Sequence, residues 1–261
     1  MTATVDHAIE RGQATTPVPP PVAPAPVPTR RRRSGFPTRL FSSSNGKKAV
    51  MAITGAILVL FLIGHMLGNL KIFLGADAFN GYAEWLRTAG EPALPARTML
   101  TITEIVLVAA VALHMWSAVS LARRAARARP VRYAVRRRSQ ANGYATHVMR
   151  YGGIVILLFV VWHLLDMTFG VVNPEGYAAT PYDRMVAGFA PSRWWVTSFY
   201  VVALAMVGLH LRHGVWSAFQ TLGLANGRRY RPLRALAGVV ALVLVVGFLA
   251  APIAVTIGVI K

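Results

Sequence analysis

Residues 148–171, VMRYGGIVILLFVVWHLLDMTFGV, form an apolar run of membrane length that contains one histidine, His163. A helix needs about 20 mostly apolar residues to cross the hydrocarbon core of a bilayer. Four more runs of this kind lie at 49–73, 99–121, 195–219 and 235–260. The sequence therefore predicts an all-α membrane protein with five transmembrane helices.

The composition agrees with a membrane protein. Hydrophobic residues make up 55% of the 261 positions, the mean hydropathy is +0.48, and 9 acidic residues stand against 28 lysines and arginines. A soluble domain rarely combines such apolarity with so little charge. The absence of cysteine excludes disulfides and thiolate-bound iron–sulfur clusters within this chain.

The first 45 residues differ from the rest. They contain TTPVPPPVAPAPVPTRRRR at 15–33, a Pro/Ala/Val tract that cannot build a hydrophobic core. We expect 1–45 to be a disordered cytoplasmic tail and 46–261 to be the five-helix transmembrane domain. The basic cluster follows the proline tract and the next apolar run is a full span, which does not fit a signal peptide.

The charge pattern predicts the orientation of the helices. Basic residues cluster beside alternate helix ends, whereas most acids lie in the connections 75–97 and 170–193. The basic clusters are 30–33 with Lys47 and Lys48, the arginines of 123–138, and Arg228, Arg229, Arg231 and Arg234. The positive-inside rule then places the N-terminus in the cytoplasm and the C-terminus outside. Topology accounts for the net charge of +19 without nucleic acid, and some arginines are available to anionic lipid or an acidic partner.

Four histidines recur at intervals of 49, 49 and 47 residues, one in each of the first four runs: His65, His114, His163 and His210. An imidazole in hydrocarbon is costly and needs a partner. Neutral histidine is a common axial ligand of haem iron, and helical bundles hold cofactors between facing helices. We therefore expect helices one to four to form a bundle that binds two bis-histidine haems. Hydrogen bonds to neighbouring carbonyls or a polar cavity are the alternatives.

Depth in the membrane predicts how the histidines pair. His65 and His163 stand 17 and 13 residues from the cytoplasmic ends of their helices, and at about 1.5 Å per residue they lie in the outer half. His114 and His210 stand only 9 and 10 residues from those ends. The predicted pairs are His65 with His163 and His114 with His210.

The small and polar residues near the histidines each have two possible roles. Glycines provide room for a flat macrocycle or serve ordinary helix packing; they are Gly64, Gly68, Gly152, Gly153, Gly208 and Gly214. Arg212 lies within the fourth run without an evident acidic partner, so it binds a haem propionate or snorkels to the surface. Further propionate candidates are Arg150, Arg123 and Tyr144, and His213 and His147 are expected at the surface or at a propionate rather than on iron.

Three segments resemble the cytochrome b membrane-anchor subunit of succinate dehydrogenases and fumarate reductases, of the single-chain, five-helix, di-haem type. They are IGHMLGNLKIFLG at 63–75, ATHVMRYGGIVILLFVVWHLLDMTFG at 145–170 and LHLRHGVWSAFQTLG at 209–223. The resemblance covers 41–261 and implies that the four histidines each ligate haem b iron. In that family the fourth ligand precedes a glycine by four positions, which selects His210 over His213.

The resemblance also implies partners and an electron path. A flavoprotein that oxidises succinate and an iron–sulfur subunit are expected on the cytoplasmic face of a bacterial plasma membrane, in a complex that is open to higher oligomerisation. Electrons are expected to enter at the His114/His210 haem, cross to the His65/His163 haem and reduce a quinone, menaquinone, near the outer face. Glu104 and Asp166 lie toward that face and are candidate proton donors to quinone, or else acids at wet helix ends.

One position departs from the family. Some fumarate reductases carry an acid two residues before the fourth-helix ligand, and this chain has Gly208 there, which argues against the fumarate-reducing direction. Two other functions stay open from the sequence: a haem b anchor of another quinone-linked dehydrogenase, such as a hydrogenase or formate dehydrogenase, and a haem-free anchor or transporter. Anchors of the former kind normally receive electrons from the outer face, whereas the basic ends here favour partners inside.

Overall fold

The computed structural model describes residues 40–128 and 143–261, and it describes side chains at 40–128 and 149–261. The chain divides into two units, 1–34 and 35–261, and all described residues lie in the second. Most of the predicted tail, with His7 and the arginines of 30–33, lies outside the described residues, as do those of 131–138. The side chains of Tyr144 and His147 lie outside them too.

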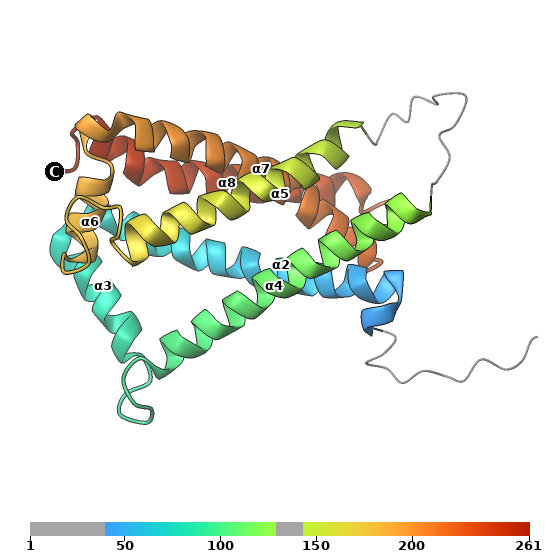
Figure 1. The fold of residues 1–261 in the computed structure, drawn as a ribbon, viewed down its shortest axis with the longest axis horizontal. Coiled ribbons are helices and arrows are strands. Elements are labelled where there is room, and N and C mark those ends of the chain that lie inside the picture. The colour runs from blue at the N-terminus through green and yellow to red at the C-terminus, as the bar shows by residue number, and fades with distance from the viewer. Residues whose placement is uncertain (1–39, 129–142) are drawn as a thin grey trace, which may run out of the picture. The chain divides into compact units, whose positions relative to one another are not determined.

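The described residues form helices, with no strand among them. Among the described residues, five helical segments are long and apolar enough to cross a membrane. They are α2 (Ser44–Asn69) with its extension η1 (Leu70–Leu74), α4 (Thr98–Arg127), α5 (Gly143–His163) with its extension η2 (Leu164–Thr168), α7 (Trp194–Thr221) and α8 (Tyr230–Thr256), as Figure 1 shows. The prediction of an all-α protein with five membrane-spanning helices is confirmed.

Local sequence signals set the limits of several helices. The hydroxyl of Ser43 accepts a hydrogen bond from the Gly46 amide at 2.9 Å and caps the start of α2. Gly75 separates η1 from the short helix α3 (Ala76–Thr88). Its φ of 93° breaks the helix, and glycine is suited to this position because a residue with a side chain rarely adopts such a φ. Thr180 caps α6 (Pro181–Gly188) in the same way as Ser43 caps α2.

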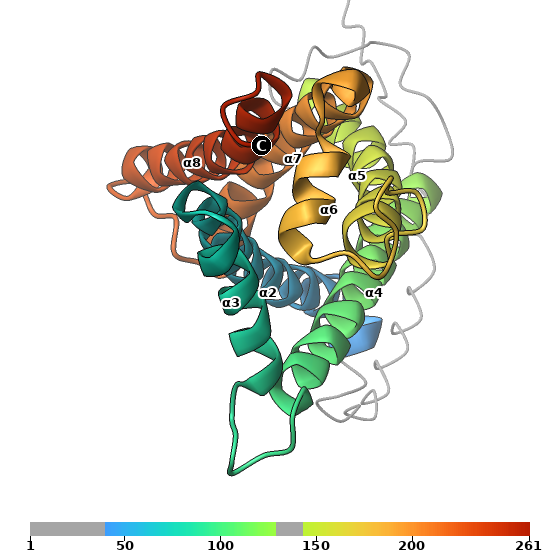
Figure 2. The same cartoon turned by 90° about the vertical axis from the view of Figure 1, so that its left-hand side faces the viewer.

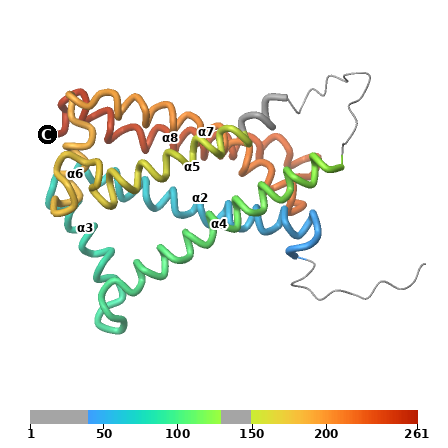
Figure 3. Tube along the Cα trace, in the orientation of Figure 1, coloured from blue at the N-terminus to red at the C-terminus, as the bar shows by residue number. Residues whose placement is uncertain are grey.

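Consecutive long helices run in opposite directions (Figure 3), so the connections alternate between two ends. Figure 2 looks onto the end that carries α3, α6 and the C-terminus. The turn η3 (Pro191–Arg193) leads from there into α7. This end holds the two connections that are richest in acids, and the exposed arginines at the end of α4 and before α8 belong to the other end. The arrangement agrees with the alternation of charge along the sequence.

The four histidine-bearing helices pack in the spatial order α4, α2, α7, α5. Helix α8 packs against α7 and α2 outside this set. Gly208 permits α7 to approach α8 closely, because a Cβ at this position would lie 2.7 Å from the Val245 side chain. Gly68 does the same for α2 and α3, because a Cβ there would lie 2.6 Å from the Tyr82 ring. Gly68 and Gly208 therefore serve helix packing.

Large apolar side chains are exposed along the outer surfaces of the long helices, among them Leu60, Val108 and Leu242. Water would make such a continuous apolar surface unfavourable, whereas hydrocarbon accommodates it. Together with the five long apolar helices, this surface identifies a multi-pass membrane protein.

Because the chain has no cysteine, single introduced cysteines report its topology. We predict that a membrane-impermeant maleimide labels Ala178→Cys, in the connection before α6, in intact cells. Gly227→Cys, in the α7–α8 connection, should be labelled only after the membrane is opened, because the basic ends are predicted to be cytoplasmic. The reverse labelling pattern, or equal labelling of both variants in intact cells, would contradict the orientation.

Candidate functional site

The four histidines lie in two pairs. The ring centroids of His65 and His163 are 5.8 Å apart, and those of His114 and His210 are 6.3 Å apart. Two imidazoles that bind one metal from opposite sides, each with a metal–nitrogen bond of about 2 Å, have ring centroids roughly 6 Å apart. The structure therefore brings together the pairs that depth in the membrane predicts, at a separation that suits a shared metal ion.

Each pair joins two helices that are not immediate neighbours. The first pair links α2 with α5 and the second links α4 with α7, and neither combination is among the closely packed helix pairs of the described residues. In the packing order α4, α2, α7, α5, these combinations are the next-but-one helices. The histidine side chains thus reach across the bundle from helices whose backbones stay apart, which is how bundles accommodate a cofactor.

Hydrogen bonds fix the tautomer of His114. Its Nδ1 lies 3.1 Å from the carbonyl oxygen of Met51 and 3.3 Å from the hydroxyl of Thr54. Because a carbonyl oxygen only accepts, Nδ1 must carry the hydrogen, which leaves the Nε2 lone pair free. Metal-ligating histidines are held in this way. Gly55 makes room for the ring, since a Cβ there would lie 3.4 Å from His114 Cε1.

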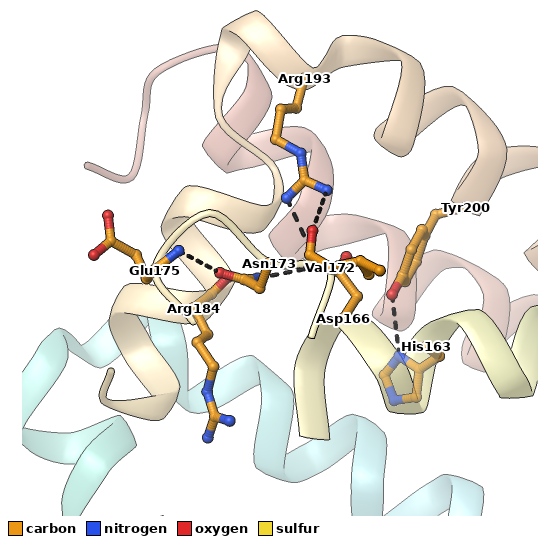
Figure 4. A network of polar contacts seen from close by, with 8 residues as sticks. All are labelled: His163, Asp166, Val172, Asn173, Glu175, Arg184, Arg193 and Tyr200. Atoms are coloured by element: carbon orange, nitrogen blue, oxygen red, sulfur yellow. Dashed lines mark hydrogen bonds and ion pairs between the residues drawn. The ribbon is translucent and has the colours of Figure 1, made fainter. Parts of the chain in front are cut away.

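The His65/His163 pair, named the outer pair after its predicted depth, lies among aromatic rings, and the His114/His210 pair is named the inner pair. His163 Nδ1 lies 3.2 Å from the Tyr200 hydroxyl (Figure 4), and the His65 ring stacks on Phe61 at 5.3 Å between centroids. In the inner pair, Nδ1 of His210 is buried without a hydrogen-bond partner among the described residues. The described residues therefore leave the tautomer of His210 open, unlike that of His114.

The side chains present fit a bis-histidine haem. A Cβ at Gly64, Gly153 or Gly214 would meet no atom within 4 Å, so these glycines leave open space beside the histidine helices, unlike Gly68 and Gly208. Within the described part of the chain, no three His, Cys, Asp or Glu side chains gather as a metal site. A haem needs only two protein ligands, because the macrocycle supplies the other four nitrogens. Haem ligation itself stays a prediction.

The residues predicted to meet haem propionates lie at the surface of the chain. Arg212, Arg150 and Arg123 are exposed, and none of them forms an ion pair with a described residue. His213 is half-buried one turn beyond His210. These surface positions are compatible with a propionate contact, which stays a prediction.

A different cation is buried near the inner pair. Lys47 is 8% exposed, donates a hydrogen bond to Ser120, and lies 5.1 Å from the centroid of the Trp116 ring. The sequence predicts only a topological role for it. At the same end a cavity of about 1080 Å³ opens between α2, α4 and α7 and reaches Met51, the residue that holds His114. Its polar lining includes Ser44, Lys48, Arg124, Ser217 and Gln220.

Asp166 is fully buried at the end that carries α3, α6 and the C-terminus, in the network of Figure 4. Its Oδ1 accepts a hydrogen bond from Asn173 Nδ2 at 3.1 Å and lies 3.7 Å from Arg193 Nη1. Arg193 Nη2 donates to the Val172 carbonyl at 3.4 Å. The acid thereby ties the end of α5 to the following connection and to the start of α7, while its Oδ2 has no hydrogen-bond partner among the described residues.

Glu104 has a different environment. Its side chain is 54% exposed and its carboxylate lies 4.0 Å from Arg97 Nη2. An exposed pair at this distance contributes at most about 1 kcal/mol to stability. Trp194 and Trp195 are also exposed at the start of α7, at the depth where aromatic side chains favour a membrane interface.

The sequence analysis missed the groups that hold the histidines. Tyr200 precedes His210 by ten residues on α7, which places it about 15 Å closer to the end that carries α6, at the depth of the His65/His163 pair. Thr54 precedes His65 by eleven residues and lies at the depth of the inner pair. The depth count that pairs the histidines would have found both. Arg193 and Asn173 lie in a connection, where depth counting carries no signal.

Residues 125–248 match the family model of the succinate dehydrogenase/fumarate reductase transmembrane subunit. The matched segment contains His163 and His210, one member of each pair, whereas His65 and His114 precede it. Comparisons with curated proteins and with solved structures find no match.

Proposed function

Through residues 125–248 the chain belongs to the succinate dehydrogenase/fumarate reductase transmembrane subunit family, and from this premise we propose that it is the di-haem cytochrome b anchor of a succinate:quinone oxidoreductase. One haem b binds between His65 and His163 and the other between His114 and His210. Oxidation of succinate takes place on a partner, and this chain carries electrons to the quinone.

The observation that carries this proposal is the presence of two histidine pairs at different depths of one bundle. Haem iron, when bound, supplies the one-electron redox chemistry that none of these side chains has. The polypeptide supplies neutral imidazoles, their orientation and an apolar surrounding. The Met51 carbonyl holds His114 with Nε2 free, and the Phe61 ring supports His65.

The basic end of the bundle is the proposed entry side. Exposed arginines lie at the end of α4 and before α8, and one of them, Arg124, lines the cavity that reaches Met51. A flavoprotein and an iron–sulfur subunit are proposed to dock here, on the cytoplasmic face. Rim cations of this kind steer an acidic partner and fix its orientation. Arg212, Arg150 and His213 are proposed to meet the propionates of the inner haem.

The outer end is the proposed quinone side. Reduction of a quinone to a quinol takes up two protons, and carboxyl groups are suitable donors. Asp166 follows His163 by three residues, so it lies about one turn farther out, and its buried Oδ2 is free to carry a proton. Glu104 is proposed to supply the second proton from the exposed face of α4. Menaquinone is the proposed acceptor.

We predict that each ligand variant removes one specific haem. His65→Ala and His163→Ala should both lose the outer centre, and His114→Ala and His210→Ala should both lose the inner one, lowering haem from two to one per polypeptide. His213→Ala is the matched control and should keep both. Haem content and redox titration of the purified complexes check this. Loss of the same centre from His65→Ala and His114→Ala would contradict the pairing.

We predict that the detergent-solubilised chain co-purifies with a flavoprotein and an iron–sulfur subunit, and that this complex reduces a menaquinone analogue with succinate. Identification of the partner chains and a succinate-dependent quinone assay test the function. Recovery of a complete partner set without succinate activity would overturn the assignment.

Asp166→Asn and Glu104→Gln should each slow quinone reduction several-fold, because each removes a proton donor, while leaving succinate oxidation by a soluble dye intact. Arg193→Gln is the control for Asp166, because it breaks the same ion pair and keeps the acid. If Arg193→Gln slows quinone reduction as much as Asp166→Asn does, the effect comes from the lost pair. Normal quinone kinetics in both acid variants would remove these acids from the mechanism.

A further inference from the structure

The proposed haem ligands differ in what holds the Nδ1 atom. In His114 it is bound by a main-chain carbonyl, and in His210 it has no hydrogen-bond partner among the described residues. In His163 it lies 3.2 Å from a side-chain hydroxyl, that of Tyr200. His163 is thus a ligand candidate whose support can be removed by substituting one side chain on another helix.

Tyr200 is held firmly in this position. It is only 5% exposed, and its ring packs edge-on against Phe159 at 5.0 Å and against Phe189 at 4.7 Å between centroids. A tyrosine has two side-chain torsions, and these contacts restrict both. Figure 4 shows the hydroxyl directed from α7 toward the His163 ring on α5. The hydroxyl therefore has a fixed location relative to His163.

The direction of this hydrogen bond follows from the role of the other ring nitrogen. A histidine that binds a metal through Nε2 carries its hydrogen on Nδ1, so Nδ1 donates and the phenol oxygen accepts. An acceptor at Nδ1–H orients the ring and increases the basicity of the ligating nitrogen. A more basic ligand stabilises oxidised iron over reduced iron and so makes the reduction potential more negative.

We propose that Tyr200 is a positioning residue for the outer haem. By accepting a hydrogen bond from Nδ1–H of His163, its hydroxyl fixes the tautomer and the ring orientation and holds the reduction potential of the outer centre below the value that it has without the bond. The inference rests on the proposed function, because it requires a haem between His65 and His163. The inner centre, whose His114 is held by the Met51 carbonyl, is independent of Tyr200.

Tyr200→Phe in the complete complex tests this inference, because it removes the hydroxyl and keeps the packed ring. We expect two haems per polypeptide, a shift of the outer centre to a more positive potential, and an altered low-spin electron paramagnetic resonance signal for that centre alone. The centre missing from His65→Ala identifies the outer haem. Tyr182→Phe is the matched control: its hydroxyl donates to the Lys261 carbonyl at the same end, and both potentials should stay at wild-type values.

The possible results separate the inference from the proposed function. A wild-type complex without two bis-histidine haems overturns the proposed function. Two haems in wild type with unchanged potentials in Tyr200→Phe overturn only the role of Tyr200, as does an equal shift of both centres or the same shift in Tyr182→Phe. Loss of the outer haem alone from Tyr200→Phe supports positioning. Failure of the variant to assemble counts against the inference, because it assigns the hydroxyl to folding.

Discussion

An imidazole inside a membrane requires a partner, and this requirement governs the arrangement of the bundle. The chain places one such group on each of four helices, and the helices pack so that the imidazoles meet in two pairs. Each pair reaches between helices that are not packed closely on each other. Packing of α2 with α4, of α2 with α7 and of α7 with α5 sets the positions of both pairs at once. A shift of any one of these helices along its axis would separate two histidines.

The polar groups away from the histidines differ between the two ends. At the end that carries α6 a buried acid, Asp166, joins the extension of α5 to the start of α7 through Arg193. At the other end most cations of the described residues are exposed, and the buried Lys47 is met by a hydroxyl and an indole ring rather than by an acid. The ordered connection at one end and the exposed cations at the other agree with the proposed anchor, in which a partner docks at the basic end and quinone binds at the opposite end.

Much of the fold could be predicted from the sequence, because apolar length and histidine depth are both measured along the chain. The five helices and the two pairs follow from counting residues alone. Rotation of a helix about its axis leaves a weaker signal in the sequence. For this reason Gly68 and Gly64 look equivalent beside His65, although the first packs against Tyr82 and the second has open space. Partners that depend on rotation, such as Tyr200 for His163, and those in connections, such as Arg193 for Asp166, needed the three-dimensional structure.

The central claim is that the paired histidines bind two haems. The most direct test is the haem content of the purified wild-type protein, measured per polypeptide together with the electron paramagnetic resonance spectrum of its oxidised form. The account predicts two haems b, both low-spin, because each iron has two imidazole ligands. Protein that is folded and free of haem, or that holds a single haem or a high-spin centre with an open coordination position, would contradict it.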